Sequence, residues 1–140
     1  GISYPQGWYL NTEASPHTVN LIAHTFSGEE TLLVRVALNY VEYDKLFESF
    51  DAFATWYGSN LPASMHVTSH ENYSDFRPPQ HVYAGERLEN DRPFIFRLVV
   101  LKGKDNMAYV LGIMMATEYA SVLAPVVKEV AASMIVGQQD

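Results

Sequence analysis

The sequence predicts an α+β fold in which a mostly antiparallel sheet is covered by two main helices, as in an α/β/α sandwich. Apolar residues alternate with period two in several segments that short turns connect, and in two other segments they recur three and four positions apart. No internal repeat or low-complexity tract divides the 140 residues. Residues 1–140 are therefore expected to form a single domain.

The first two strand signals predict a hairpin. Thr18–Phe26 is the first clear strand signal, and Leu32–Val41 places alternate apolar residues on one face. The turn residues Ser27-Gly28-Glu29 separate the two segments. The opposite face of the second strand carries Arg35 and Asn39, so that face is partly solvated or lies near a site.

The next segment has the period of a helix. Its apolar stripe consists of Leu46, Phe50, Phe53 and Tyr57. Asp44 stands at the N-cap position, and Gly58 fits the left-handed C′ position after the helix. Trp56 lies off the stripe and is expected in the core, with the edge of a groove as the alternative. The outer face, with Glu48 and Asp51, is expected to be solvated.

The second half of the chain returns to period two and ends in a helix. Strands are predicted over Met65–His70, Val82–Leu88, Pro93–Leu101 and Met107–Ala116, with Tyr73–Gln80 as a loop. The last strand is apolar on both faces and should be central. Its small residues Ala108, Gly112 and Ala116 would let a helix approach closely. The closing helix is predicted over Ser121–Val136, with Pro125 in its first turn.

Composition excludes several classes of function. The net charge is −7 and only nine residues are basic, so neither nucleic acid nor an anionic membrane surface is an expected partner. The longest apolar run is about half of a membrane span. The chain has no cysteine, which removes disulfides and thiolate metal sites. No cofactor or metal is expected, although a loose calcium site with oxygen ligands stays open.

The start of the chain bears on localisation. It begins at Gly1 without an initiator methionine, which indicates an expression remnant or a mature protein after removal of a signal. A removed lipid-anchor segment would not be visible in this sequence.

The histidines and serines do not form a recognisable catalytic motif. His66 and His70 are four apart, but Val67 stands where the zinc motif H-E-x-x-H has glutamate. In a strand the two rings would share a face about 13 Å apart, too far for one zinc ion. The nucleophile pattern G-x-S-x-G is also missing. The protein is therefore expected not to be an enzyme, unless a pocket joins a histidine, a carboxylate and a hydroxyl.

Two polar segments are candidates for binding a protein partner, because loops that mix aromatic and charged residues resemble interface hot spots. The candidate contact residues are Tyr73, Asp75 and Phe76 in the loop, and Glu86, Glu89 and Asp91 in the turn of the following hairpin. The alternatives are that the two rings pack beneath the loop and that the acidic turn is ordinary solvated surface.

Three short motifs resemble the PsbP-like fold family. They are Tyr4-Pro5-Gln6-Gly7-Trp8 before the first strand, Ala84-Gly85 on a middle strand and Ser133-Met134 near the end. That family includes an extrinsic photosystem II subunit, a Ran-binding nuclear import factor and DcrB-type bacterial envelope lipoproteins. Some immunity proteins against type VI secretion effectors look similar. The resemblance implies one PsbP-like domain over residues 1–140.

The resemblance also implies a non-enzymatic protein that docks onto other proteins in the bacterial periplasm or envelope. Its most specific version is an immunity protein, a toxin inhibitor whose acidic loop enters the cleft of a type VI antibacterial effector. The alternative is a small-ligand carrier or an assembly factor of an envelope complex. The carrier predicts a deep apolar pocket between sheet and helix, lined by Trp56 or Tyr57. The oligomeric state is left open.

Overall fold

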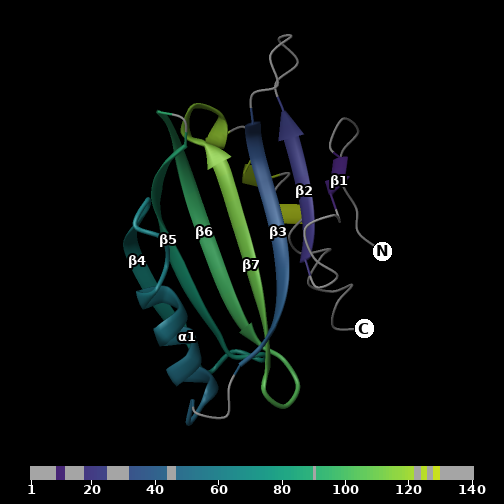
Figure 1. The fold of residues 1–140 in the computed structure, drawn as a ribbon, viewed down its shortest axis with the longest axis vertical. Helices are drawn as coiled ribbons and strands as arrows, with labels where there is room; N and C mark the ends of the chain where they lie inside the picture. The colour runs from purple at the N-terminus through teal and green to yellow at the C-terminus, as the bar shows by residue number, and fades with distance from the viewer. Residues whose placement is uncertain are drawn as a thin grey trace.

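The computed structural model describes residues 9–11, 18–24, 32–43, 47–89, 91–121, 124–125 and 128–129. These residues form one seven-stranded sheet with a helix packed on it (Figure 1). The strands are β1 (Tyr9–Asn11), β2 (Thr18–His24), β3 (Leu32–Glu42), β4 (Met65–Tyr73), β5 (Gln80–Glu89), β6 (Arg92–Lys102) and β7 (Met107–Ala116). Their order across the sheet is β1-β2-β3-β7-β6-β5-β4. Every neighbouring pair is antiparallel, which confirms the α+β class.

Most of the strand predictions are confirmed. The predicted hairpin is the β2–β3 pair, and β7 has the predicted bounds and the predicted central place, between β3 and β6. On β3, Val34 and Val36 are fully buried, and Arg35 between them points to the opposite face. β4 is longer than expected, since it continues from His70 to Tyr73 and forms an edge of the sheet.

Helix α1 (Phe50–Ser59) has other ends than those predicted. Its N-cap is Ser49, whose side chain accepts a hydrogen bond from the backbone N–H of Ala52 at 3.1 Å. Asp44, the predicted cap, lies outside the described residues. Gly58 is inside the helix and not at C′. A Cβ atom there would lie 2.0 Å from the ring of Tyr83, so the glycine allows the helix to approach the sheet.

The aromatic stripe of α1 packs on one face of the sheet, which we call the helix face. Phe50 and Phe53 are buried against a cluster formed by Tyr43, Tyr83, Leu98, Val100, Ala108 and Val110. The ring of Phe53 stacks on Tyr43 with centroids 4.8 Å apart. Trp56 is 49% exposed, so its predicted core position is wrong. It lies at the edge of the cluster against Phe47 and Phe53.

One α-helix, and not two, is present as a defined element in the described residues. The predicted closing helix Ser121–Val136 falls largely outside them, although residues 120–121, 124–125 and 128–129 have helical backbone. A short 3-10 helix, η1 (Thr117–Tyr119), follows β7. In the part of the chain that is described, no helix combines the length and the apolar character that crossing a bilayer requires.

Candidate functional site

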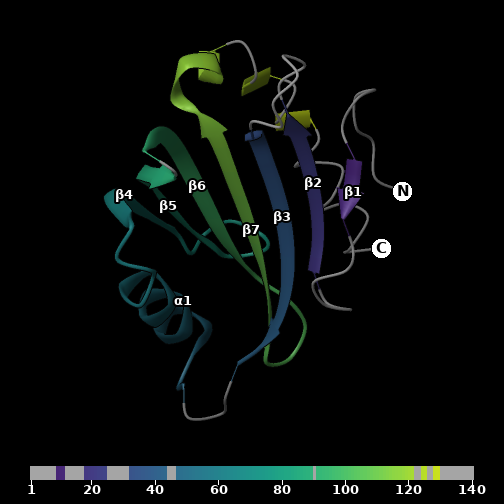
Figure 2. The ribbon, with the colours of Figure 1, turned by 45° about the horizontal axis from the view of Figure 1, so that its top comes forward.

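An apolar groove lies on the helix face beside α1. It encloses about 460 Å³, including its open mouth, and five strands contribute to it. Its lining residues are Arg35, Ala37, Met65, Arg87, Phe96, Arg97, Leu98, Gly112, Ile113 and Met114. In Figures 1 and 2, α1 lies over β4 and β5 toward one end of the sheet, and none of the described lining residues belongs to α1.

The groove exists because small residues meet in the middle of the sheet. Ala37 on β3 pairs with Gly112 on β7, so no large side chain rises between these strands. A Cβ atom on Gly112 would contact only Leu98, at 3.7 Å, and the carbonyl oxygen of Ala37, at 4.0 Å. The small-residue face was predicted to receive a helix. Only Ala108 lies in the cluster under α1, whereas Gly112 lines open space.

Two arginines stand at opposite sides of this groove. Arg35 lies on β3 and Arg87 on β5, and both are half-buried. The Nε atom of Arg87 is buried and has no hydrogen-bond partner among the described residues. An unsatisfied buried N–H of this kind costs about 1–3 kcal/mol. None of the described lining residues is acidic, so the groove is locally positive in a protein of net charge −7.

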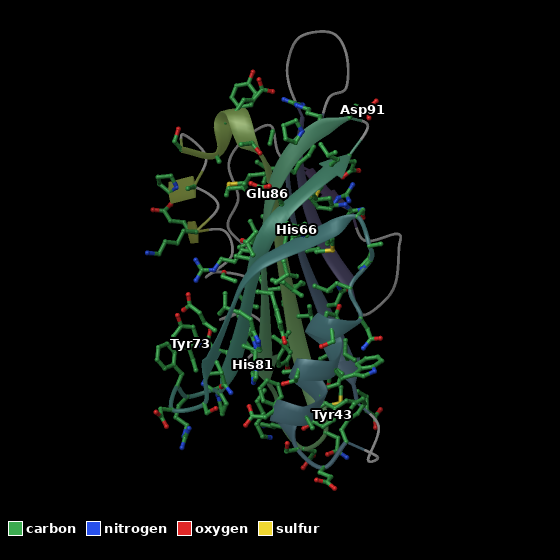
Figure 3. The ribbon with its side chains drawn as sticks, turned by 90° about the vertical axis from the view of Figure 1, so that its left-hand side faces the viewer. Tyr43, His66, Tyr73, His81, Glu86 and Asp91 are labelled. Carbon is green, nitrogen blue, oxygen red and sulfur yellow. The ribbon has the colours of Figure 1, made fainter. Side chains whose placement is uncertain are left out.

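A second polar feature, the histidine chain, joins α1 to the sheet edge. His81 on β5 is 1% exposed, and its Nε2 lies 2.7 Å from Oδ1 of Asp51 on α1 (Figure 3). Its Nδ1 lies 2.9 Å from Nε2 of His70 on β4. Because a carboxylate only accepts, neutral His81 donates from Nε2 to Asp51 and accepts at Nδ1 from the Nε2–H of His70. Nδ1 of His70 is then the atom that takes up a proton.

A β-bulge brings His70 to this chain. The register of β4 against β5 shifts between Val67 and Ser69, so His66 pairs with Glu86 while His70 pairs with Tyr83. The prediction that the two histidines share a face is therefore wrong, since the extra residue turns them to opposite faces. Burial, and then the nearby His81, lower the pKa of His70 below its usual value.

Tyr83 completes the surroundings of the histidine chain. Its ring stacks on His70 with centroids 4.2 Å apart, and its hydroxyl donates to the backbone oxygen of Ala54 at 2.7 Å. Burial raises the pKa of Tyr83. The hydroxyl is thus bound to α1 and not to a histidine. In the described residues the histidine and carboxylate come together without the hydroxyl that nucleophilic catalysis would need.

The loop residues predicted to bind a partner lie together at one end of β5. The rings of Tyr73 and Phe76 contact each other with centroids 4.6 Å apart, and Asp75 between them is exposed. Phe76 is 51% exposed, so it does not pack beneath the loop. Arg77 holds the turn by donating to the backbone oxygens of Ser74 and Phe76.

The acidic residues predicted to bind a partner lie toward the other end of β5, as Figure 3 shows for Glu86 and Asp91. Glu86 is exposed opposite His66, and Glu89 has a buried oxygen without a partner in the described part of the chain. Asp91 has φ 63°, a left-handed turn conformation that aspartate tolerates. β5 has ten residues, or about 30 Å at ~3.3 Å each. The six candidates therefore form two groups and not one surface.

Sequence reasoning missed the histidine chain and placed Asp51 on a solvated helix face. Asp51 is 53% exposed, yet its carboxylate meets His81. One signal was available: His81 and Tyr83 alternate onto the same face of β5 as the residues under α1. Among the described residues, no three histidine, aspartate or glutamate side chains are placed to hold a metal ion.

Comparison with known proteins gives likeness in fold alone. No protein-family model matches the chain, and no curated protein matches its sequence. The motifs of the PsbP-like resemblance at residues 4–8 and 133–134 lie outside the described residues, so that resemblance stays a prediction.

Solved structures that resemble this chain include LpqN of Mycobacterium tuberculosis, a protein involved in cell envelope biogenesis. It has a TM-score of 0.54 and 11% identity, over 94% of this chain and 79% of LpqN. A protein from Bacteroides thetaiotaomicron has a TM-score of 0.54 and 13% sequence identity. The match covers 94% of this chain but 42% of that protein. PA94 of Pseudomonas aeruginosa, whose function is not known, has a TM-score of 0.58 and 8% sequence identity. The match covers 86% of this chain and 91% of PA94.

Proposed function

We propose that this chain is a non-catalytic binding protein of the bacterial cell envelope that carries a small apolar ligand in the groove. The groove carries the proposal, because it is concave, lined mainly by apolar side chains and flanked by two arginines that can orient a ligand. Its cavity of about 130 Å³ is smaller than the range of about 300–1,000 Å³ that small-molecule sites occupy, so a slender ligand is expected. The envelope part is supported by the likeness in fold to LpqN.

The groove differs in place from the pocket that the sequence suggested. Neither Trp56 nor Tyr57 is among its described lining residues, none of which belongs to α1. Its floor is formed by Phe96, Leu98 and Met114, which are at most 7% exposed. Methionine adapts its shape to different apolar groups, which suits a carrier. None of the described lining residues has a side chain that normally titrates near neutral pH, so the groove offers no general acid or base. This supports a role without catalysis.

Filling the groove should abolish ligand binding without unfolding the protein. Gly112→Val adds a β-branched side chain where a Cβ atom meets nothing closer than 3.7 Å. We expect the neutral fluorescent probe N-phenyl-1-naphthylamine to bind the unaltered protein and to lose affinity roughly tenfold or more in this variant. The measurement is a fluorescence titration, with circular dichroism to establish folding.

The matched control is Ile95→Val on the neighbouring strand β6, whose side chain alternates to the opposite face and which is not among the described lining residues. It should bind the probe like the unaltered protein. Equal binding by Gly112→Val and the unaltered protein would show that the probe is bound elsewhere and would remove the groove from the proposal.

A second candidate function is binding of a protein partner at the turn of Tyr73, Asp75 and Phe76. The exposed ring of Phe76 supports it. Its sharpest version is an immunity protein that inhibits a type VI secretion effector. Phe76→Ala with Asp75→Lys should then abolish capture of the partner from a lysate of the source bacterium, measured by mass spectrometry. Glu48→Lys, at an exposed acid just before α1, is the control. Unchanged capture would contradict this candidate.

A further inference from the structure

We propose that the ligand of the groove is a single-chain anionic amphiphile, whose acidic head binds Arg87 and whose alkyl chain lies on the apolar floor. This rests on the proposed function and adds the chemistry of the ligand. The juxtaposition that carries it is the guanidinium of Arg87, whose buried Nε has no partner among the described residues, beside Met65 and Phe96.

Arg87 has the geometry of a head-group site. It lies on β5 next to the edge strand β4, where Met65 is its partner in the register. The buried Nε of Arg87 has no acceptor in the described part of the chain. Because this Nε is buried, a carboxylate or phosphate would bind the terminal nitrogens of the planar guanidinium, which offer two parallel donors.

The charge of the described lining residues favours an anionic head over a cationic one. Arg35, on the other side, is separated from Arg87 by β7 and β6, roughly 14 Å at the usual strand spacing. No acidic residue is found among the described residues of the lining, whereas the whole chain carries sixteen acids against nine basic residues. An anion is therefore attracted to this part of the surface while the remainder of the molecule repels it.

The floor between the two arginines fits one chain. Phe96 and Met114 are neighbours in the register of β6 and β7, and Gly112 lies beside Leu98 in the next pair on this face. These side chains give an apolar strip without a polar group to desolvate. The cavity of about 130 Å³ leaves room for one alkyl chain, and the proposal commits to a fatty-acid-like carboxylate.

The test compares ligands of equal chain length by isothermal titration calorimetry. Decanoate should bind at least tenfold more tightly than 1-decanol or decyltrimethylammonium. Arg87→Gln should remove that preference, weakening decanoate roughly tenfold while leaving 1-decanol unchanged. Lys104→Gln is the matched control, because it removes the same charge from an exposed residue in the turn between β6 and β7, outside the described lining of the groove. It should keep the preference.

The outcomes separate this inference from the proposed function. Equal affinity for decanoate and 1-decanol, with both lost in Gly112→Val, would overturn the anionic class and keep the groove. Decanoate binding that Lys104→Gln weakens as much as Arg87→Gln would show a general charge effect and overturn the head-group site. Failure of all three ligands to bind the unaltered protein, or binding that Gly112→Val leaves unchanged, would overturn both proposals.

Discussion

Gly85→Ala should destabilise the protein by about 3 kcal/mol, whereas Gly112→Ala in the same sheet should change stability by less than about 1 kcal/mol. A Cβ atom at Gly85 would lie 2.0 Å from the backbone oxygen of His66 and 2.9 Å from the ring of Phe96. The oxygen belongs to β4, so it can move only if the ladder between β4 and β5 moves with it. At Gly112 the nearest atom is 3.7 Å away.

The measurement is urea unfolding of both variants, followed by circular dichroism, with the midpoint compared at constant slope. Gly112→Ala controls for the general effect of adding a methyl group in a strand. A Gly85→Ala variant as stable as Gly112→Ala would mean that β4 is not held close to β5 at this position.

The same substitution should reach the histidine chain, because Gly85 pairs with Val67 at the β-bulge. The bulge turns His70 onto the helix face, where it meets His81. If the added methyl group pushes β4 outward, the contact between the two imidazoles lengthens. The close approach of β4 to β5 at Gly85 therefore supports the contact between His70 and His81 farther along these two strands.

Much of the sheet could be predicted from the sequence, because strand periodicity is local. The alternation in residues 32–41 predicted β3, and the apolar character of both faces of residues 107–116 predicted the central place of β7. The ends of α1 could not be predicted as well. The apolar stripe begins before the helix does, and the cap is fixed by the hydroxyl of Ser49 and not by the first acid of the segment.

The sites were harder to predict because they depend on contacts between distant segments. Asp51 and His81 are 30 positions apart, and no local pattern joins them. The bulge in β4 breaks the alternation on which the placement of His66 and His70 relied. The groove depends on where α1 ends: a small residue in the sheet receives a helix where one lies above it, and Gly112 lines a hollow because α1 does not reach it.

His81→Ala should destabilise the protein by about 2–4 kcal/mol at pH 7.5. The His81 side chain is 1% exposed, so its removal leaves a cavity between α1 and the sheet. It also removes both hydrogen bonds of the histidine chain, to Asp51 and to His70. His66→Ala is the matched control, because His66 is exposed on the opposite face. Its removal should change the free energy of unfolding by no more than about 0.5 kcal/mol.

The histidine chain should also make stability depend on pH, through His70. The groups that face its imidazole are Asp51 through His81, His81 itself and Tyr83. The pKa of His70 is lowered in the folded chain, so near and below pH 6.5 the unfolded chain binds more protons than the folded one. Stability from this group is complete above pH 6.5 and decreases as the pH falls toward the lowered value.

The urea midpoint of the unaltered protein should therefore fall between pH 7.5 and 5.5, and His70→Gln should make that fall shallower. Glutamine keeps an N–H that can donate to Nδ1 of His81, but it does not titrate. In His81→Ala the fall should also be shallower, because the neighbouring imidazole that helps to lower the pKa of His70 is gone. If His70→Gln and the unaltered protein lose stability in parallel, then His70 does not sense pH through this chain, and the dependence comes from other groups.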